Sequence, residues 1–164
     1  MEIREATTKD WKKIRDLYLA LLKSDPEAFV DEYDEISLRD EDDWVKDVEN
    51  ENGKTFIAVD DNKFVGMGRI NFYEEIPEIP VLHKLGVLPE YRGKGIAKKL
   101  MKAREDWAKS MGAEKIRLYV IANRQRTIEF AKKNYYKVIE TLKNNVERND
   151  GTYIDILLME KDLV

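Results

Sequence analysis

The residues most able to do chemistry lie in one short run, 87–97, which reads VLPEYRGKGIA. The run has the form of a strand end, a turn, a glycine-rich loop and a helix start. A helix N-terminus presents unpaired backbone N–H groups and the positive end of the helix dipole, so it favours an anion. Gly93 and Gly95 let the backbone approach a bulky phosphate, and Arg92 and Lys94 add positive charge. The spacing therefore favours a phosphate site over an ordinary strand-to-helix turn.

Two common phosphate motifs are absent from this run. No Lys-Ser or Lys-Thr pair follows Gly95, so the loop is not a Walker A loop, and no third glycine completes G-x-G-x-x-G. The helix that follows is amphipathic, and Gly112 is expected to end it. Its apolar stripe consists of Ile96, Ala97, Leu100, Met101, Trp107, Ala108 and Met111.

The loop resembles the acyl-CoA pyrophosphate loop of the GNAT N-acetyltransferases. That family's pattern is Arg or Gln, two residues, Gly, one residue, then Gly or Ala, and here Arg92, Gly95 and Ala97 meet it. The resemblance extends to the hydrophobic strand before the loop and to a second segment, 123–135, about 30 residues later. It implies that acetyl-CoA is a co-substrate.

Composition sets the outer limits of the prediction. The 164 residues suffice for one domain with a real core, and we expect a single domain over 1–164. No apolar run approaches the roughly 20 residues of a membrane span, and the first residues do not read as a signal peptide. Without cysteine, and with one histidine, the chain is expected to hold no disulfide and no metal, and to work in the cytoplasm.

Charge is segregated along the chain, although the net charge is only −4. Residues 25–51 hold thirteen acids and two bases, whereas residues 92–137 hold fourteen bases and four acids. A basic C-terminal half suits a ligand with several phosphates, and an acidic N-terminal half suits a cationic co-substrate. Solvated helix faces are the competing explanation for the acidic segment.

The order of predicted elements is βααβββαβαββ, the GNAT order, in an α/β fold with a mixed sheet. A parallel pair is expected where the glycine-loop helix crosses over. Thr7 or Thr8 is expected to cap the first helix, and Ser37 the second. The stretch 74–80, which contains two prolines, is expected to end the strand 63–73. The strands are predicted over 2–6, 54–60, 63–73, 81–87, 114–121, 136–148 and 152–159, and the short helix after the fifth strand over 123–133.

By resemblance, the cofactor would lie in a gap between the fourth and fifth strands. Backbone groups of Leu85 and Val87 would bind the pantetheine arm, and the Val87 N–H would also stabilise the oxyanion that forms on the thioester carbonyl. Backbone amides from Arg92 to Ala97 would hold the pyrophosphate. The cofactor-binding positions are thus Leu85, Val87, Arg92, Gly93, Lys94, Gly95, Ile96, Ala97, Asn123 and Phe130.

The second segment both matches the family and departs from it. Asn123 occupies the position of a CoA-contacting asparagine, although a helix N-cap would also explain it. Ala131 stands where the family often has the tyrosine that protonates the thiolate, and Asn134 stands for a glycine, whose left-handed conformation Asn tolerates. The proton donor is therefore open between water and a tyrosine from another position: Tyr135, Tyr136, Tyr119 or Tyr73.

Transfer to an amine also requires a base, because a primary amine has a pKa of about 10. Glu78 precedes the fourth strand, near the expected entry of the amine. His83 lies on that strand and, by simple alternation, on the same side as Leu85 and Val87. A structural role for this histidine is the alternative. Three acids of the 25–51 segment are expected to border the acceptor site: Glu27, Glu32 and Glu35.

The sequence thus predicts an N-acetyltransferase that moves an acetyl group from acetyl-CoA to a small cationic amine by direct attack on the thioester. A protein N-terminus or a lysine is the alternative acceptor. A non-catalytic acyl-CoA binding module is the alternative of another class, motivated by Ala131. No nucleic acid or membrane partner is expected, since the bases of 92–137 are spread around several elements. An open terminal strand would permit a homodimer.

Overall fold

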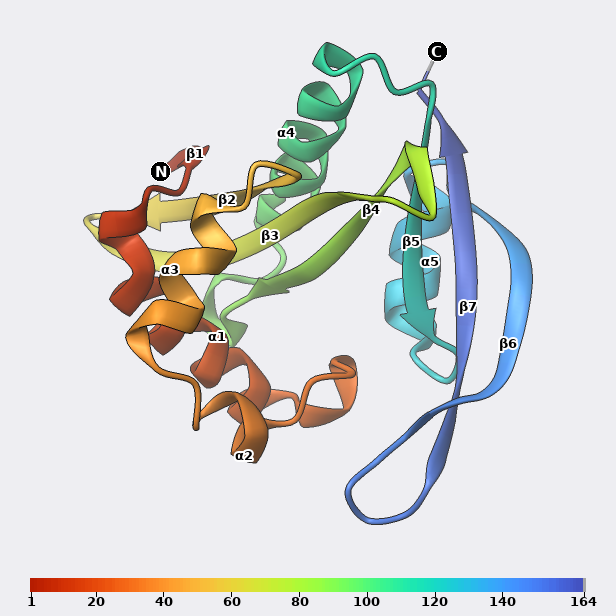
Figure 1. The fold of residues 1–164 in the computed structure, drawn as a ribbon, viewed down its shortest axis with the longest axis horizontal. Helices are drawn as coiled ribbons and strands as arrows, with labels where there is room; N and C mark the ends of the chain where they lie inside the picture. The colour runs from red at the N-terminus through yellow and green to blue at the C-terminus, as the bar shows by residue number, and fades with distance from the viewer. Residues whose placement is uncertain (164) are drawn as a thin grey trace.

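Seven strands form one mixed sheet in the order β1-β2-β3-β4-β5-β7-β6 in the computed structural model, which describes residues 1–163 (Figure 1). Neighbouring strands are antiparallel except β4 and β5, which are parallel. The strands are β1 (Glu2–Glu5), β2 (Gly53–Asp60), β3 (Lys63–Tyr73), β4 (Ile76–Val87), β5 (Lys115–Ile121), β6 (Lys137–Glu147) and β7 (Tyr153–Asp162). The α-helices are α1 (Trp11–Ser24), α2 (Tyr33–Ile36), α3 (Glu41–Glu49), α4 (Ile96–Ser110) and α5 (Gln125–Lys133). This confirms the predicted mixed α/β fold.

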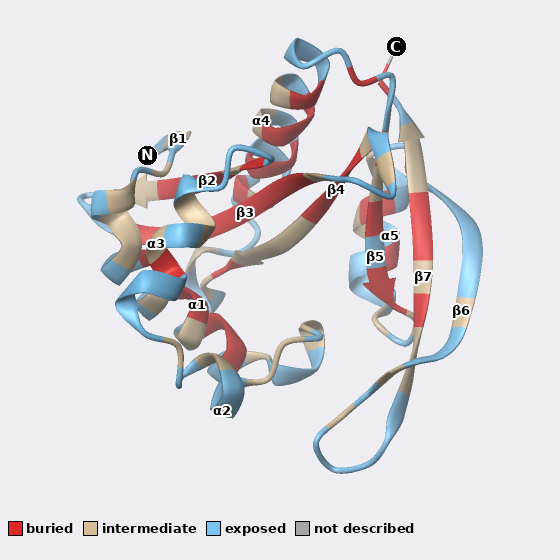
Figure 2. Cartoon of the chain, in the orientation of Figure 1, coloured by how far each residue is buried: buried red, intermediate tan, exposed pale blue. Residues whose placement is uncertain are grey.

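Helices cover both faces of the sheet, and each face has its own core (Figure 2). One core joins α1 and α3 to β2 and β3 and is built around Tyr18 and Trp44. The other core joins α4 and α5 to the sheet, with Leu100 and Ile116 fully buried. Apolar side chains recur at helical spacing on α1 and α4, so each helix buries one stripe; on α4 the buried face also contains Arg104 and Glu105.

The sheet opens between β4 and β5. Ladder pairing between these strands is confined to Val81 with Arg117 and Leu82 with Leu118. Beyond Leu82, β4 continues along β3 but no longer pairs with β5, and Figure 1 shows the two strands diverging. A parallel pair that separates in this way leaves the backbone groups on one edge of β4 free for a ligand.

Three predicted boundaries in the first half of the chain are wrong. Asp10, not Thr7 or Thr8, is the N-cap of α1, because Thr7 caps a short 3₁₀ turn, Thr8–Asp10, that precedes the helix. The fourth strand begins at Ile76 rather than at residue 81, because Pro77 and Pro80 lie in a stretch where the β3–β4 ladder is interrupted and no N–H is needed. The second long helix begins at Glu41 and is capped by Asp40, whose carboxylate accepts a hydrogen bond of 3.0 Å from the Asp43 N–H. Ser37, the predicted cap, instead ends the short α2.

None of the helices in the described part of the chain combines the length and the hydropathy needed to cross a membrane.

Candidate active site

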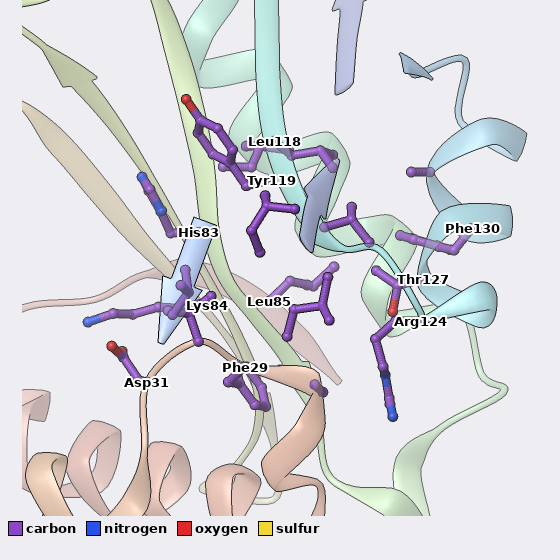
Figure 3. A pocket seen from close by; sticks show the side chains of 18 of the residues that line it. Phe29, Asp31, His83, Lys84, Leu85, Leu118, Tyr119, Arg124, Thr127 and Phe130 are labelled. Carbon is purple, nitrogen blue, oxygen red and sulfur yellow. The ribbon is translucent and has the colours of Figure 1, made fainter. Parts of the chain in front are cut away.

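A cavity of about 530 Å³ occupies the place where β4 leaves β5 (Figure 3). Most of its wall is apolar and comes from β4, β5 and α5, with Leu85 and Phe130 among the side chains that line it. The loop between α1 and α2 closes one side with Phe29 and Asp31. The polar or charged side chains along the wall are Tyr18, Asp31, His83, Lys84, Arg104, Tyr119, Arg124, Thr127 and Asn145.

An irregularity in β4 decides which side chains face which core. Lys84 has a φ of +55°, and the β3–β4 register shifts there, so that β4 has one extra residue between the pairs Arg69–His83 and Met67–Gly86. This bulge breaks the alternation on which the placement of His83 relied. Leu82, Leu85 and Val87 all pack in the core of α4. His83, the ladder partner of Arg69, lies on the face of α1 and α3, so the expectation that it shares a side with Leu85 and Val87 is wrong.

Asp31 is the acidic side chain of the described residues that lines this cavity. The Tyr18 hydroxyl donates a hydrogen bond of 2.6 Å to its carboxylate. Burial, and then the nearby Asp31 carboxylate, raise the pKa of Tyr18, so the phenol stays protonated and keeps donating. Lys84 lies across the Tyr18 ring, 5.1 Å from the ring centroid, and pairs with Asp47 at 3.5 Å. The sequence indicated an acidic segment but did not single out Asp31, because its place beside β4 depends on the fold.

His83 faces the cavity with an aromatic partner. The Tyr73 hydroxyl lies 2.7 Å from His83 Nε2. Burial, followed by the charges of Lys84, Arg104 and Arg69, lowers the pKa of His83 to about 4. The imidazole is therefore neutral at pH 7, with Nε2 in contact with the Tyr73 hydroxyl.

The low pKa of His83 predicts a stability cost in mild acid. The unfolded chain takes up the proton as the pH falls through about 6.5, but the folded chain does so only near 4, so the free energy of unfolding falls over this window. Relative to His83→Gln, the wild-type protein is expected to lose about 3 kcal/mol more between pH 7 and pH 4. Urea denaturation of both proteins at each pH measures this difference, and parallel pH profiles would contradict it.

The glycine-rich loop ends in an open helix N-terminus. Gly95 is the N-cap of α4, and no side chain caps this end of the helix. Gly93 and Gly95 have φ of +77° and +80°, a left-handed conformation that glycine adopts without strain, and no other group lies within 4 Å of where a Cβ would stand. The Arg92 side chain bends back, and its Nε donates to the Val87 carbonyl at 3.0 Å. This contact fixes the loop against the end of β4 and leaves the first-turn amides open to an anion.

The Val87 N–H points toward the gap between the strands. The neighbouring Leu88 N–H donates to the Val65 carbonyl of β3 at 2.9 Å, so the adjacent pair, Gly66 with Val87, is of the non-hydrogen-bonded kind. The backbone groups of Val87 are accordingly directed away from β3. This orientation is the one required of a donor that meets a ligand lying along β4.

The structure brings some predicted site residues together and leaves others apart. Leu85, His83 and Phe130 line the cavity, and the loop of residues 92–97 follows directly on the same strand. Tyr119 and Ala131 line it too. Glu78 is exposed and lines neither this cavity nor the one described next.

A second cavity, of about 640 Å³, lies beside the first, between the acidic segment and the β6–β7 turn. Glu27 and Glu32 line it, as does Asn123, whereas Glu35 does not. Asn123 is not the N-cap of α5, because that position belongs to Arg124. The Asn149 N–H donates to the Glu32 carboxylate at 2.9 Å, which ties the turn to the acidic segment.

The end of α5 corrects one feature of the second matching segment. The left-handed residue is Tyr135, with φ of +75°, whereas Asn134 has φ of −98°. Tyr135 is 78% exposed and lines neither cavity. The next residue, Tyr136, is buried and donates to Glu105 at 2.7 Å.

Tyr135→Gly is expected to raise the free energy of unfolding by about 1 kcal/mol, since a left-handed conformation costs a non-glycine residue about 1–2 kcal/mol. Thermal or urea denaturation measures the gain, and Tyr135→Phe, which keeps the strain, is the matched control. A stability equal to that of the wild type would contradict the prediction. The same variants test the proton-donor hypothesis for Tyr135, because loss of a catalytic hydroxyl would lower kcat in both.

The parted parallel strands and the uncapped, glycine-rich helix N-terminus beside them are the arrangement expected of an acyl-CoA-dependent transferase. A family model, described as Acetyltransferase (GNAT) family, matches residues 11–135. The chain therefore belongs to the GNAT acetyltransferase family, whose co-substrate is acetyl-CoA.

Solved structures share the fold at low sequence identity. A GNAT-family acetyltransferase from Streptococcus pneumoniae superposes with a TM-score of 0.85 at 20% identity, covering 98% of each chain. An N-acetyltransferase from Staphylococcus aureus Mu50 gives 0.83 at 21% identity, covering 99% of this chain and 98% of that one. A presumed acetyltransferase, yncA from Salmonella typhimurium, was solved with its cofactor acetyl-CoA and gives 0.82 at 18% identity, covering 100% of this chain and 94% of that one.

Proposed function

We propose that this protein transfers an acetyl group from acetyl-CoA to a small cationic amine. The observation that carries the proposal is the cavity where β4 separates from β5. The glycine-rich loop follows directly after β4, and Asp31 lines the cavity from the loop between α1 and α2. A cofactor along β4 and an amine beside Asp31 would meet in this cavity. Both substrates would then be held in line for direct attack.

The cofactor is proposed to bind mainly through backbone groups. The pyrophosphate would accept hydrogen bonds from the amides of residues 92–97, beside the positive end of α4. The pantetheine arm would lie along Leu85 and Val87, with Phe130 packed against it. Asn123 lines the neighbouring cavity and could reach the cofactor from there.

In the proposed reaction the amine nitrogen attacks the thioester carbonyl, an N–C bond forms and the C–S bond breaks. The Val87 N–H stabilises the oxyanion. His83, neutral at pH 7 and lining the cavity, is the proposed acceptor of the amine proton, with Glu78 the alternative. The leaving thiolate takes a proton from the Tyr119 hydroxyl on β5 or from water, because Ala131 supplies none.

Asp31 supports a cationic acceptor. A carboxylate held by the Tyr18 hydroxyl keeps a fixed position in a partly apolar wall, where a charged hydrogen bond with an ammonium group gains strength. Glu27 and Glu32 in the adjoining cavity would add to the attraction.

A protein N-terminus is a second candidate acceptor. Two structural neighbours are named ribosomal-protein-alanine N-acetyltransferases, from Brucella melitensis at 19% identity and from Escherichia coli, for S18, at 15% identity. The second cavity adjoins the first and could receive a peptide chain. An acceptor peptide with a free N-terminus therefore belongs in any test.

The deciding experiment measures free-thiol release from acetyl-CoA with polyamines, monoamines, neutral amines and peptides, beside calorimetry with CoA. Turnover that favours small cationic amines would support the proposal. Turnover with peptides alone would replace the acceptor. CoA binding without turnover would favour a non-catalytic acyl-CoA module, and no CoA binding would overturn the proposal.

We further propose that residues 1–164 act as one domain, since both cores pack on one sheet. A cytoplasmic location stays the expectation from the cysteine-free composition.

A further inference from the structure

Arg104 is a fully buried cation that pairs with no carboxylate among the described residues. It lies on α4, is 1% exposed and lines the cavity. Burial lowers its pKa to about 10, so it stays charged at pH 7. Burying a charge is costly unless the charge is paired or hydrogen-bonded. The partners of this guanidinium therefore indicate what it does.

The guanidinium bonds to backbone carbonyls of three elements. Its Nε donates to the Leu100 carbonyl one turn earlier on α4, at 3.1 Å. Its Nη1 donates to the Arg69 carbonyl of β3 at 3.2 Å and to the His83 carbonyl of β4 at 3.3 Å. The side chain thus joins α4 to two strands at one point.

That point is the start of the bulge. Arg69 and His83 are ladder partners, and the extra residue of β4 follows them, with Lys84 in the left-handed conformation. His83 is also the first residue beyond the last β4–β5 pair, Leu82 with Leu118. A bulge disrupts the ladder locally, so backbone groups beside it need other partners. Arg104 satisfies the His83 carbonyl where β4 turns away from β5.

Gly68 on β3 makes room for the guanidinium. A Cβ at this position would stand 2.8 Å from Arg104 Cζ and 2.9 Å from Nε. The space is therefore matched to Arg104, and a side chain at Gly68 would displace the guanidinium from the carbonyls.

We propose that Arg104 is a positioning residue that holds the bulge of β4 and so keeps the gap between β4 and β5 open for the acyl-pantetheine arm. The part concerning the cofactor rests on the proposed function. Without Arg104, two buried carbonyls lose their donor and the strand is free to relax toward regular pairing. The Leu85 and Val87 backbone groups then lose their fixed orientation toward the thioester.

The test compares Arg104→Met with Arg104→Lys, which keeps a positive charge and hydrogen-bond donors but loses the planar fork of the guanidinium. Arg104→Met is expected to raise the KM for acetyl-CoA and to weaken CoA binding by 10- to 100-fold, while the KM for the amine changes less than threefold. Arg104→Lys is expected to recover most of the affinity. Glu105→Gln is the matched control, because Glu105 is the next buried residue of α4 but bonds to Tyr136 and Lys161, away from β4.

Hydrogen exchange read by mass spectrometry makes the test independent of the cofactor. Peptides that cover residues 81–88 are expected to exchange faster in Arg104→Met than in the wild type, and to be unchanged in Glu105→Gln. If the wild type binds no CoA, the proposed function fails while this readout still decides the role of Arg104. Unchanged exchange and unchanged CoA affinity in a folded Arg104→Met protein would overturn the proposal. If Arg104→Met does not fold, Gly68→Ala applies the same two measurements to a displaced guanidinium.

Discussion

A Gly95→Glu protein is expected to fold but to show no CoA binding by calorimetry at concentrations that saturate the wild type. Gly95 is the N-cap of α4, and a Cβ at this position would meet no other group within 4 Å, so there is room for a side chain. The new carboxylate would lie where the pyrophosphate is proposed to bind. It would also neutralise the partial positive charge of the helix N-terminus that attracts the pyrophosphate. Repulsion between the carboxylate and the phosphates adds to the loss.

Backbone strain alone could lower stability, because Glu at a φ of +80° costs about 1–2 kcal/mol. Gly112→Glu separates this effect from the effect on the ligand. Gly112 has a φ of +86°, is equally open and lies past the other end of α4, so the strain is matched and the pyrophosphate is distant. CoA affinity is expected to survive in Gly112→Glu. Full CoA affinity in Gly95→Glu would show that the loop does not bind the cofactor.

Asp31→Asn is expected to lower kcat/KM for cationic amines by about 10- to 100-fold, which corresponds to the 1.5–3 kcal/mol typical of a hydrogen bond to a charged group. The amide oxygen of Asn can still accept from the Tyr18 hydroxyl, so the wall of the cavity is retained while its charge is lost. CoA affinity is expected to stay within twofold. Thiol-release kinetics with paired cationic and neutral amines measure the change in selectivity.

Glu35→Gln is the matched control for this charge change. Glu35 belongs to the same acidic segment but is exposed and lines neither cavity. Selectivity for cations is expected to be retained in this variant. Equal losses in both variants would show that the overall charge of the segment attracts the amine, and that Asp31 has no particular role.

The sequence predicted those parts of the fold that depend on local rules. The order of the strands and of the longer helices follows from apolar spacing, and the glycine-loop helix from glycine, whose conformational freedom acts within a few residues; the short α2 was not predicted. Gly95 marks the start of α4 as expected. The loop could therefore be found without knowledge of its distant neighbours.

The errors arise where backbone geometry departs from a simple period. Alternation placed His83 with Leu85 and Val87, but one extra residue at Lys84 reverses the sides. The family pattern placed the left-handed residue at Asn134, whereas Asn134 is the C-cap of α5 with a φ of −98° and the left-handed residue is Tyr135. Neither left-handed position, Lys84 or Tyr135, is a glycine, so the sequence did not indicate either shift.

The remaining site residues were hidden because they depend on contacts between distant segments. Asp31 was one of thirteen acids in 25–51 until the fold placed it beside Tyr18. Arg104 was one of fourteen bases in 92–137 until α4 packed on β3 and β4. Only tertiary structure distinguishes a buried charge from an exposed one.

The parting of β4 and β5 separates the sheet into two leaves, β1–β4 and β5–β7 with β6 at the edge. Two ladder pairs join the leaves within the sheet, and outside it Arg124 pairs with Asp25 at 2.6 Å, across 99 residues of chain. The proposed cofactor contacts fall mostly on β4 and α4, whereas the acidic segment proposed to face the amine contains only the short helical turns η2 and α2. To change the acceptor, residues 27–35 could therefore be redesigned while the proposed cofactor contacts on β4 and α4 are left unchanged.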